Sequence, residues 1–115
     1  MRLDPARLDA VQQLVPPTPF SSDGAAAGPD VLAAFVRSLY DAGVLVFLPA
    51  AGTGEFHSLS AAEVATCVRA TLEAVGRGCV VLAPVGFGVA HAVEIGRSAV
   101  EAGADALLLM PPIHP

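Results

Sequence analysis

The chain has 115 residues, of which 54% are hydrophobic and 15% charged, and its eleven acidic and six basic side chains give a formal net charge of −5. This composition is too apolar for a disordered chain, and the deficit of cations argues against nucleic-acid binding. All six basic residues are arginines, so the chain cannot itself carry a Walker A motif, a pyridoxal-phosphate lysine or a lysine Schiff base.

Strand-like and helix-like segments alternate along the chain. Asp4 and Pro5 mark the start of an opening helix, predicted over Pro5–Val11. Short apolar runs without polar alternation then predict parallel strands buried on both faces: Leu14–Val15, Val44–Leu48, Cys79–Ala83 and Ala106–Met110. Amphipathic stretches between them predict three helices with one buried face each: Val31–Ala42, Ala61–Val75 and Val89–Ala102.

The predicted helix ends carry recognisable signals. Ser60 and Glu63 have the spacing of a capping box, in which each side chain bonds the other residue's backbone N–H. Gly43 and Gly103 follow the first and third main helices, where glycine accepts the left-handed conformation that ends a helix. Both segments then lead into a strand and a proline, which indicates a weak internal repeat of helix–strand units.

This order of elements predicts an α/β fold in one partial domain over residues 1–115: an opening helix, then four parallel strands with three covering helices between them. The N-terminal half of an eightfold (β/α)8 barrel and a small doubly wound sheet both fit. The sequence ends at Pro111–Pro115 without a fourth helix, which a complete doubly wound domain normally has. The half-barrel is therefore the preferred interpretation.

Four loops fall at the carboxyl ends of the predicted strands, where parallel α/β folds bind ligands. They are Pro16–Phe20, Ala51–Ser58, Pro84–Gly88 and Pro111–Pro115. The second contains Gly52, Thr53 and Gly54. Its glycines let the backbone approach a ligand, its successive N–H groups can form an anion-binding nest, and its threonine adds a hydroxyl donor. The pattern suits a carboxylate or phosphate oxygen, and it also suits a tight turn without a ligand.

Dinucleotide binding is disfavoured. Gly52-x-Gly54 and Gly86-x-Gly88 both lack the third glycine of that motif, which is replaced by His57 and His91 respectively. His91 is expected to be a solvated position in a helix.

Two further histidines and a glutamate are candidates for a pocket. His57 and His114 could face it and titrate near neutral pH, and Glu55 could act as an acid or base or could bond loop amides.

Metal binding and secretion are also disfavoured. Cys67 and Cys79 fit no zinc-ligand spacing, so we expect two buried, reduced thiols and no metal or cofactor. The N-terminus lacks the apolar core of a signal peptide, and the apolar runs are too short to cross a membrane. A cytoplasmic protein without a membrane partner is expected.

Three motifs together resemble the dihydrodipicolinate synthase and N-acetylneuraminate lyase superfamily. They are Pro17-Thr18-Pro19-Phe20, Gly52-Thr53-Gly54-Glu55-Phe56 and Pro84-Val85-Gly86. The Gly-Thr-Gly-Glu-Phe version, with a later Leu-Leu-Leu-Met-Pro-Pro, is most similar to the 5-dehydro-4-deoxyglucarate dehydratase branch. The resemblance implies a (β/α)8 barrel that forms a Schiff base between a lysine and a 2-oxo acid, and in this branch loses water and carbon dioxide to give 2,5-dioxopentanoate.

The resemblance also assigns roles to residues. Gly52, Thr53 and Gly54 would bind the substrate carboxylate, with Thr18 near the same pocket. The synthases have threonine at Gly52, which favours the dehydratase branch. The family usually has tyrosine after the prolines of the fourth strand, where Ile113 and His114 stand here, and its catalytic lysine and tyrosine lie on later strands. The 115 residues alone are therefore expected to be inactive.

Three alternatives to a dehydratase remain open. One is an enzyme like 4-hydroxy-tetrahydrodipicolinate synthase, and another is a complete small α/β domain. The third is a non-catalytic half-barrel that binds small carboxylates or self-associates. An unclosed barrel leaves strand edges unpaired and apolar surface bare, so a homo-oligomer is expected.

Overall fold

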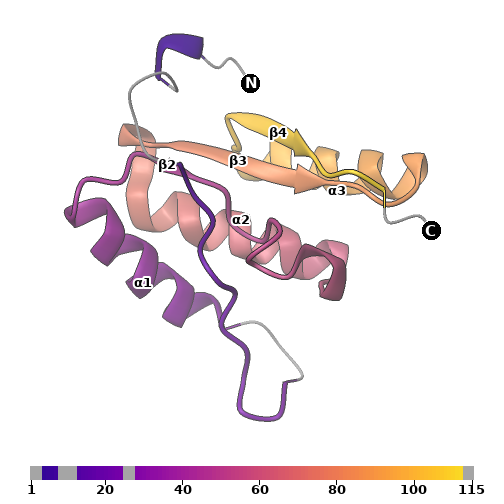
Figure 1. Ribbon diagram of the computed structural model, residues 1–115, viewed down its shortest axis with the longest axis horizontal. Coiled ribbons are helices and arrows are strands. Elements are labelled where there is room, and N and C mark those ends of the chain that lie inside the picture. Colours follow the sequence, from indigo (N-terminus) through magenta and orange to yellow (C-terminus); the bar gives the residue numbers. More distant parts are fainter. Residues whose placement is uncertain (1–3, 8–12, 25–27, 113–115) are drawn as a thin grey trace.

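The computed structural model in Figure 1 describes residues 4–7, 13–24 and 28–112. Its four strands are all parallel, and they form one sheet in the order β1-β2-β3-β4. Their bounds are Gln13–Leu14 for β1, Val46–Phe47 for β2, Val80–Val85 for β3 and Ala106–Leu109 for β4. The helices between them are α1 (Pro29–Asp41), α2 (Ala61–Val75) and α3 (Val89–Ala102).

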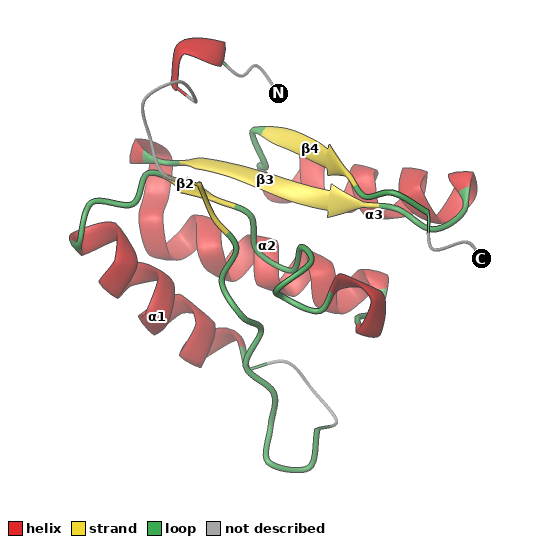
Figure 2. Ribbon diagram, in the orientation of Figure 1, coloured by secondary structure: helices red, strands yellow, loops and turns green. Residues whose placement is uncertain are grey.

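The sheet order distinguishes the two folds that the sequence allowed. Each strand pairs with the next strand along the chain. In Figure 2 the helices α1, α2 and α3 cover one face of the sheet. A doubly wound sheet reverses its strand order and carries helices on both faces, whereas a barrel adds each strand–helix unit to the same side. The described part of the chain therefore has the architecture of a (β/α)8 barrel over four of its strands.

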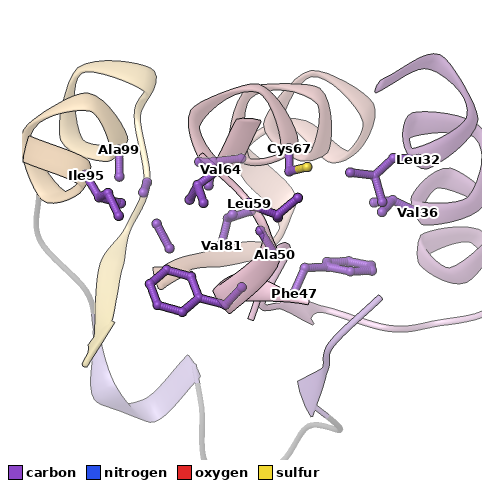
Figure 3. Close-up of a cluster of buried hydrophobic side chains, with 14 of the residues drawn as sticks. Leu32, Val36, Phe47, Ala50, Leu59, Val64, Cys67, Val81, Ile95 and Ala99 are labelled. Carbon is purple, nitrogen blue, oxygen red and sulfur yellow. The ribbon is translucent and has the colours of Figure 1, made fainter. Parts of the chain in front are cut away.

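The main core lies between the sheet and the helices. Figure 3 shows Leu32 and Val36 of α1 on one side of Phe47, while Ile95 and Ala99 of α3 lie at the other end of the cluster. A second, smaller cluster on the opposite face of the sheet contains Val46, Leu48, Ala51 and Val80. The prediction that the strands are buried on both faces is thus confirmed for β2 and β3.

Several predicted elements need correction. Of the predicted opening helix, the described residues contain one 3-10 turn, Pro5–Arg7 (η1), which the Asp4 carboxylate caps at the N–H of Ala6 (3.0 Å). The rest of that prediction falls on residues 8–12, which lie outside the described residues. The strand β4 is not fully buried, since Leu109 is 75% exposed. The other differences are in bounds: β1 and β4 end one residue earlier than predicted, β2 is shorter, β3 extends to Val85 and α1 spans Pro29–Asp41.

The predicted end signals of the helices are confirmed, and the bounds of α2 and α3 are those predicted. The Ser60 N–H donates to the Glu63 carboxylate (2.8 Å), and the Glu63 N–H donates to the Ser60 hydroxyl (3.2 Å). Gly43 and Gly103 have φ angles of 103° and 101°. These signals explain why α2 and α3 have the predicted bounds.

We expect Ser60→Ala to lower the free energy of unfolding by about 1 kcal/mol, because the first turn of α2 loses its side-chain acceptor. Chemical denaturation followed by circular dichroism measures this loss. Ser58→Ala is the matched control, since Ser58 is exposed and its side chain makes no hydrogen bond with another described residue. Equal effects of the two substitutions would contradict the prediction.

Both cysteines are free and buried, as predicted. Burial raises the pKa of the Cys67 thiol, and a hydrogen bond with Thr18 opposes this shift. Burial likewise raises the pKa of Cys79. Both thiols therefore remain protonated near neutral pH. None of the described helices has the length and apolarity that crossing a bilayer requires.

Candidate functional site

The Gly52-Thr53-Gly54 turn lies at the carboxyl end of β2, on the rim where the sequence predicts a site. Two neighbouring strands reach the same rim. A Cβ atom added at Gly52 would lie 4.0 Å from Cε of Met110, the residue after β4, and one added at Gly86 would lie 3.2 Å from the Met110 Cβ. The ends of β2, β3 and β4 thus meet beside the turn.

The turn presents unpaired backbone donors. Glu55 N–H donates to the Gly52 carbonyl (3.0 Å), and Phe56 N–H donates to the Ala51 carbonyl (3.2 Å), which closes the turn. Within the described residues, no acceptor bonds the N–H groups of Gly52, Thr53 or Gly54. Gly52 and Thr53 are exposed. Successive free N–H groups of this kind can bind an anion.

The conformation of the turn is held under backbone strain. Ala50 and Glu55 flank it with φ angles of 59° and 61°, a region that non-glycine residues rarely adopt. Gly54 passes so close to the Ala50 backbone that an added Cβ would lie 2.8 Å from the Ala50 Cα. Strain of this type costs on the order of 1–3 kcal/mol per residue, and it occurs most often at functional sites.

Thr18, which follows the neighbouring strand β1, holds the turn through a hydrogen bond. The residue follows β1 and is 8% exposed, and its hydroxyl donates to the Gly54 carbonyl at 2.6 Å. The structure therefore brings Thr18 to the Gly52–Gly54 turn. Its hydroxyl proton is used inside the protein, so the observed role of Thr18 is to hold the turn. Direct contact between Thr18 and a substrate stays a prediction.

We expect Thr18→Val to lower the free energy of unfolding by about 1–3 kcal/mol, because the buried Gly54 carbonyl loses its donor. Thr18→Ser keeps the hydroxyl and is the matched control. Urea denaturation measures stability, and the amide chemical shifts of Gly52, Thr53 and Gly54 report the turn. If the valine and serine variants behaved alike in both measurements, the bond would not hold the turn.

Sequence reasoning missed an aromatic cluster beside the turn. The ring of buried Phe56 stacks on that of Phe87, with 5.1 Å between centroids and 20° between planes. His57 and His91 both place their rings edge-on to Phe87, at 5.3 and 5.1 Å. Phe87 itself has a φ of 65° and is 45% exposed. The unusual φ of a bulky residue gives no signal in the sequence, so the cluster could not be predicted.

The remaining candidate residues are less informative. His57 and Glu55 are exposed on the same rim, and His91 is half-buried rather than fully solvated. His114 lies outside the described residues. No group of three or more histidine, cysteine, aspartate or glutamate side chains in the described ranges could hold a metal ion.

The sequence of the chain is similar to a known protein family and to curated proteins. The model of the dihydrodipicolinate synthetase family matches residues 12–114. A probable 5-dehydro-4-deoxyglucarate dehydratase from Streptomyces coelicolor is 42% identical over 109 residues, which are 90% of this chain and 34% of that protein.

Solved structures agree with this similarity. Dihydrodipicolinate synthase from Bacillus clausii superposes with a TM-score of 0.83 at 38% identity, over 90% of this chain and 35% of that chain. An Escherichia coli K12 prophage protein of the dihydrodipicolinic acid synthase family, solved in complex with pyruvate, has a TM-score of 0.78 at 29% identity over the same shares. The present chain spans about a third of the length of the proteins it matches.

Proposed function

Because this chain belongs to the dihydrodipicolinate synthetase family, we propose that it forms the carboxylate-binding part of the active site of a Schiff-base lyase acting on a 2-oxo sugar acid. The observation that carries the proposal is the turn after β2, with three successive N–H groups that no described residue accepts. The pyruvate complex of the E. coli family member supports a small 2-oxo acid as the ligand class.

The proposed chemistry follows from what such a turn can do. A 2-oxo acid that condenses with an amine forms an imine, and the protonated imine withdraws electrons from the neighbouring carbon. Donors fixed on the adjacent carboxylate orient that imine and favour the reacting geometry. In this proposal Gly52, Thr53 and Gly54 bind the carboxylate and Thr18 holds the turn. The chain contains no lysine, so a Schiff-base lysine must come from residues other than these 115.

We propose 5-dehydro-4-deoxyglucarate as the substrate, which would be dehydrated and decarboxylated in a cytoplasmic pathway of sugar-acid breakdown. Curated relatives with that probable activity support this branch, as does Gly52, where the synthases have threonine. An added Cβ at Gly52 meets only a methionine methyl group at 4.0 Å, so the turn itself does not require glycine there. The residue at position 52 can therefore distinguish the two branches. Gly54 cannot, because its close approach to the Ala50 backbone requires glycine.

Titration of the isotopically labelled chain with pyruvate tests the carboxylate site. We expect the amide signals of Gly52, Thr53 and Gly54 to shift most, and methyl pyruvate, which has no carboxylate, to leave them unchanged. Shifts confined to other regions, or equal shifts with the ester, would refute the proposed site.

Borohydride treatment of the chain with pyruvate should give no lysine adduct, and turnover by the 115 residues alone would contradict the proposed division of the active site.

A further inference from the structure

Met110, the first residue after β4, lies on the rim that carries the Gly52–Gly54 turn. Its N–H donates to the Val85 carbonyl (2.8 Å), which extends the pairing of β4 with β3 by one residue. Alternate residues of a strand face opposite sides of the sheet. Leu108 and Met110 accordingly both pack against the smaller cluster, on the face without helices, and Met110 also reaches the main core. Pairing and packing therefore fix where the Met110 side chain starts.

The Met110 side chain ends beside the first residue of the turn. Its Cβ lies 3.2 Å from a Cβ added at Gly86, and its Cε lies 4.0 Å from a Cβ added at Gly52. The side chain thus runs from the end of β3 toward the turn, with the methyl group at its tip. Because 4.0 Å is an ordinary contact between two carbon atoms, room for one methyl or methylene group lies between Met110 Cε and Gly52 Cα.

This one-carbon space has an apolar side and a polar edge. The Met110 methyl group cannot form a hydrogen bond, Gly52 and Gly86 have no side chain, and the neighbouring Phe56 is aromatic. The Gly52 N–H, which no described residue accepts, is only two bonds from the Cβ position that marks the space. A ligand with an anion on the N–H groups can therefore place an adjoining carbon against Met110.

We propose that Met110 is a specificity-determining residue, which contacts the carbon next to the oxo group of a 2-oxo acid and selects a methyl or methylene group there. This inference rests on the proposed function, in which the turn binds the carboxylate. The carbon in question is two bonds from the carboxylate carbon, so it lies within reach of the one-carbon space. A hydroxyl group on it would lose water and find no partner at the thioether. The proposed substrate, a 4-deoxy sugar acid, has a methylene group at this carbon.

Methyl-labelled methionine tests the contact directly. The chain has two methionines, Met1 and Met110, so labelling gives two methyl signals, and Met110→Leu identifies which belongs to Met110. We expect pyruvate to shift the Met110 methyl signal with the same dissociation constant as the amide signals of Gly52, Thr53 and Gly54. Amide shifts without a methyl shift would overturn the contact and leave the carboxylate site standing. If the amides do not shift, the carboxylate site fails and this inference fails with it.

Two ligands of equal size test the selectivity. 2-Oxobutanoate and hydroxypyruvate differ only in a methyl or hydroxyl group on the carbon next to the oxo group. We expect 2-oxobutanoate to bind at least about 5-fold more tightly, because the hydroxyl group loses its hydrogen bonds with water. Met110→Gln, which adds an amide at similar length, should abolish this preference, whereas Met110→Leu should keep it.

The dissociation constants of both ligands come from the amide shifts of the turn, and circular dichroism confirms that the variants are folded. Equal affinities in the unsubstituted chain would overturn the selectivity without reference to any variant. A preference that Met110→Gln leaves intact would overturn the role of Met110, because another part of the molecule would then discriminate between the ligands. Neither result affects the proposed carboxylate site, which the comparison of pyruvate with its methyl ester tests separately.

Discussion

Gly54→Ala should destabilise the protein by about 2–3 kcal/mol, which for a chain of this size lowers the melting temperature by roughly 10–20 °C. The added Cβ would lie 2.8 Å from Cα and 2.9 Å from N of Ala50, and both are backbone atoms that cannot rotate away. The turn would have to open, and the hydrogen bond from Thr18 to the Gly54 carbonyl would lengthen. Thermal unfolding and the amide shifts of the turn measure both effects.

Gly52→Ala is the matched control for this prediction, two residues away in the same turn. Its added Cβ meets nothing closer than 4.0 Å, so the stability should change by less than about 0.5 kcal/mol. If both substitutions were neutral, the close approach of Gly54 to Ala50 would not constrain the turn. If both were equally damaging, general flexibility rather than this contact would explain the requirement for glycine.

Phe56→Ala should have the largest effect on stability, about 3–5 kcal/mol. Phe56 is fully buried, it stacks on Phe87, and its ring lies against Gly86, where an added Cβ would lie 2.9 Å from Phe56 Cε1. Removing the ring leaves a cavity directly below the rim, so the strained backbone at Phe87 loses its support. Urea denaturation measures the loss.

Phe35→Ala provides the comparison for Phe56→Ala, because Phe35 is 41% exposed on α1 and less of its ring is removed from water. We expect it to cost less than half as much. Similar midpoints for the two variants would show that the aromatic cluster is not what stabilises the rim.

The sequence predicts the helices better than the strands, for physical reasons. Caps and a continuous apolar stripe fix α2 and α3 locally. The residue at which β3 ends depends on how this strand pairs with β2 and β4. Its pairing with β2 stops at Val81, while Val81 and Val85 turn their carbonyls toward β4. The nitrogen of Pro84 therefore faces a side without a strand partner, so proline is tolerated inside a strand that the sequence ends at Ala83.

The position of the Gly52–Gly54 turn could be predicted from the sequence, but its backbone conformation and its hydrogen bond with Thr18 could not. The position of Gly52–Gly54 follows from the strand order, because carboxyl ends of parallel strands share a rim. Glycine adopts left-handed backbone most readily, but around the turn this conformation occurs at Ala50, Glu55 and Phe87, which the sequence does not indicate. The bond from Thr18 to Gly54 joins residues 36 positions apart, and no local pattern encodes such a contact.

The strand order also bears on how this molecule forms during translation. β2, β3 and β4 each pair with the strand synthesised immediately before them, so none of these pairings has to wait for a distant segment to leave the ribosome. Each new strand–helix unit can add to a surface that already exists. Assembly can thus proceed from the N-terminal end in the order of synthesis, with β4 as the growing edge.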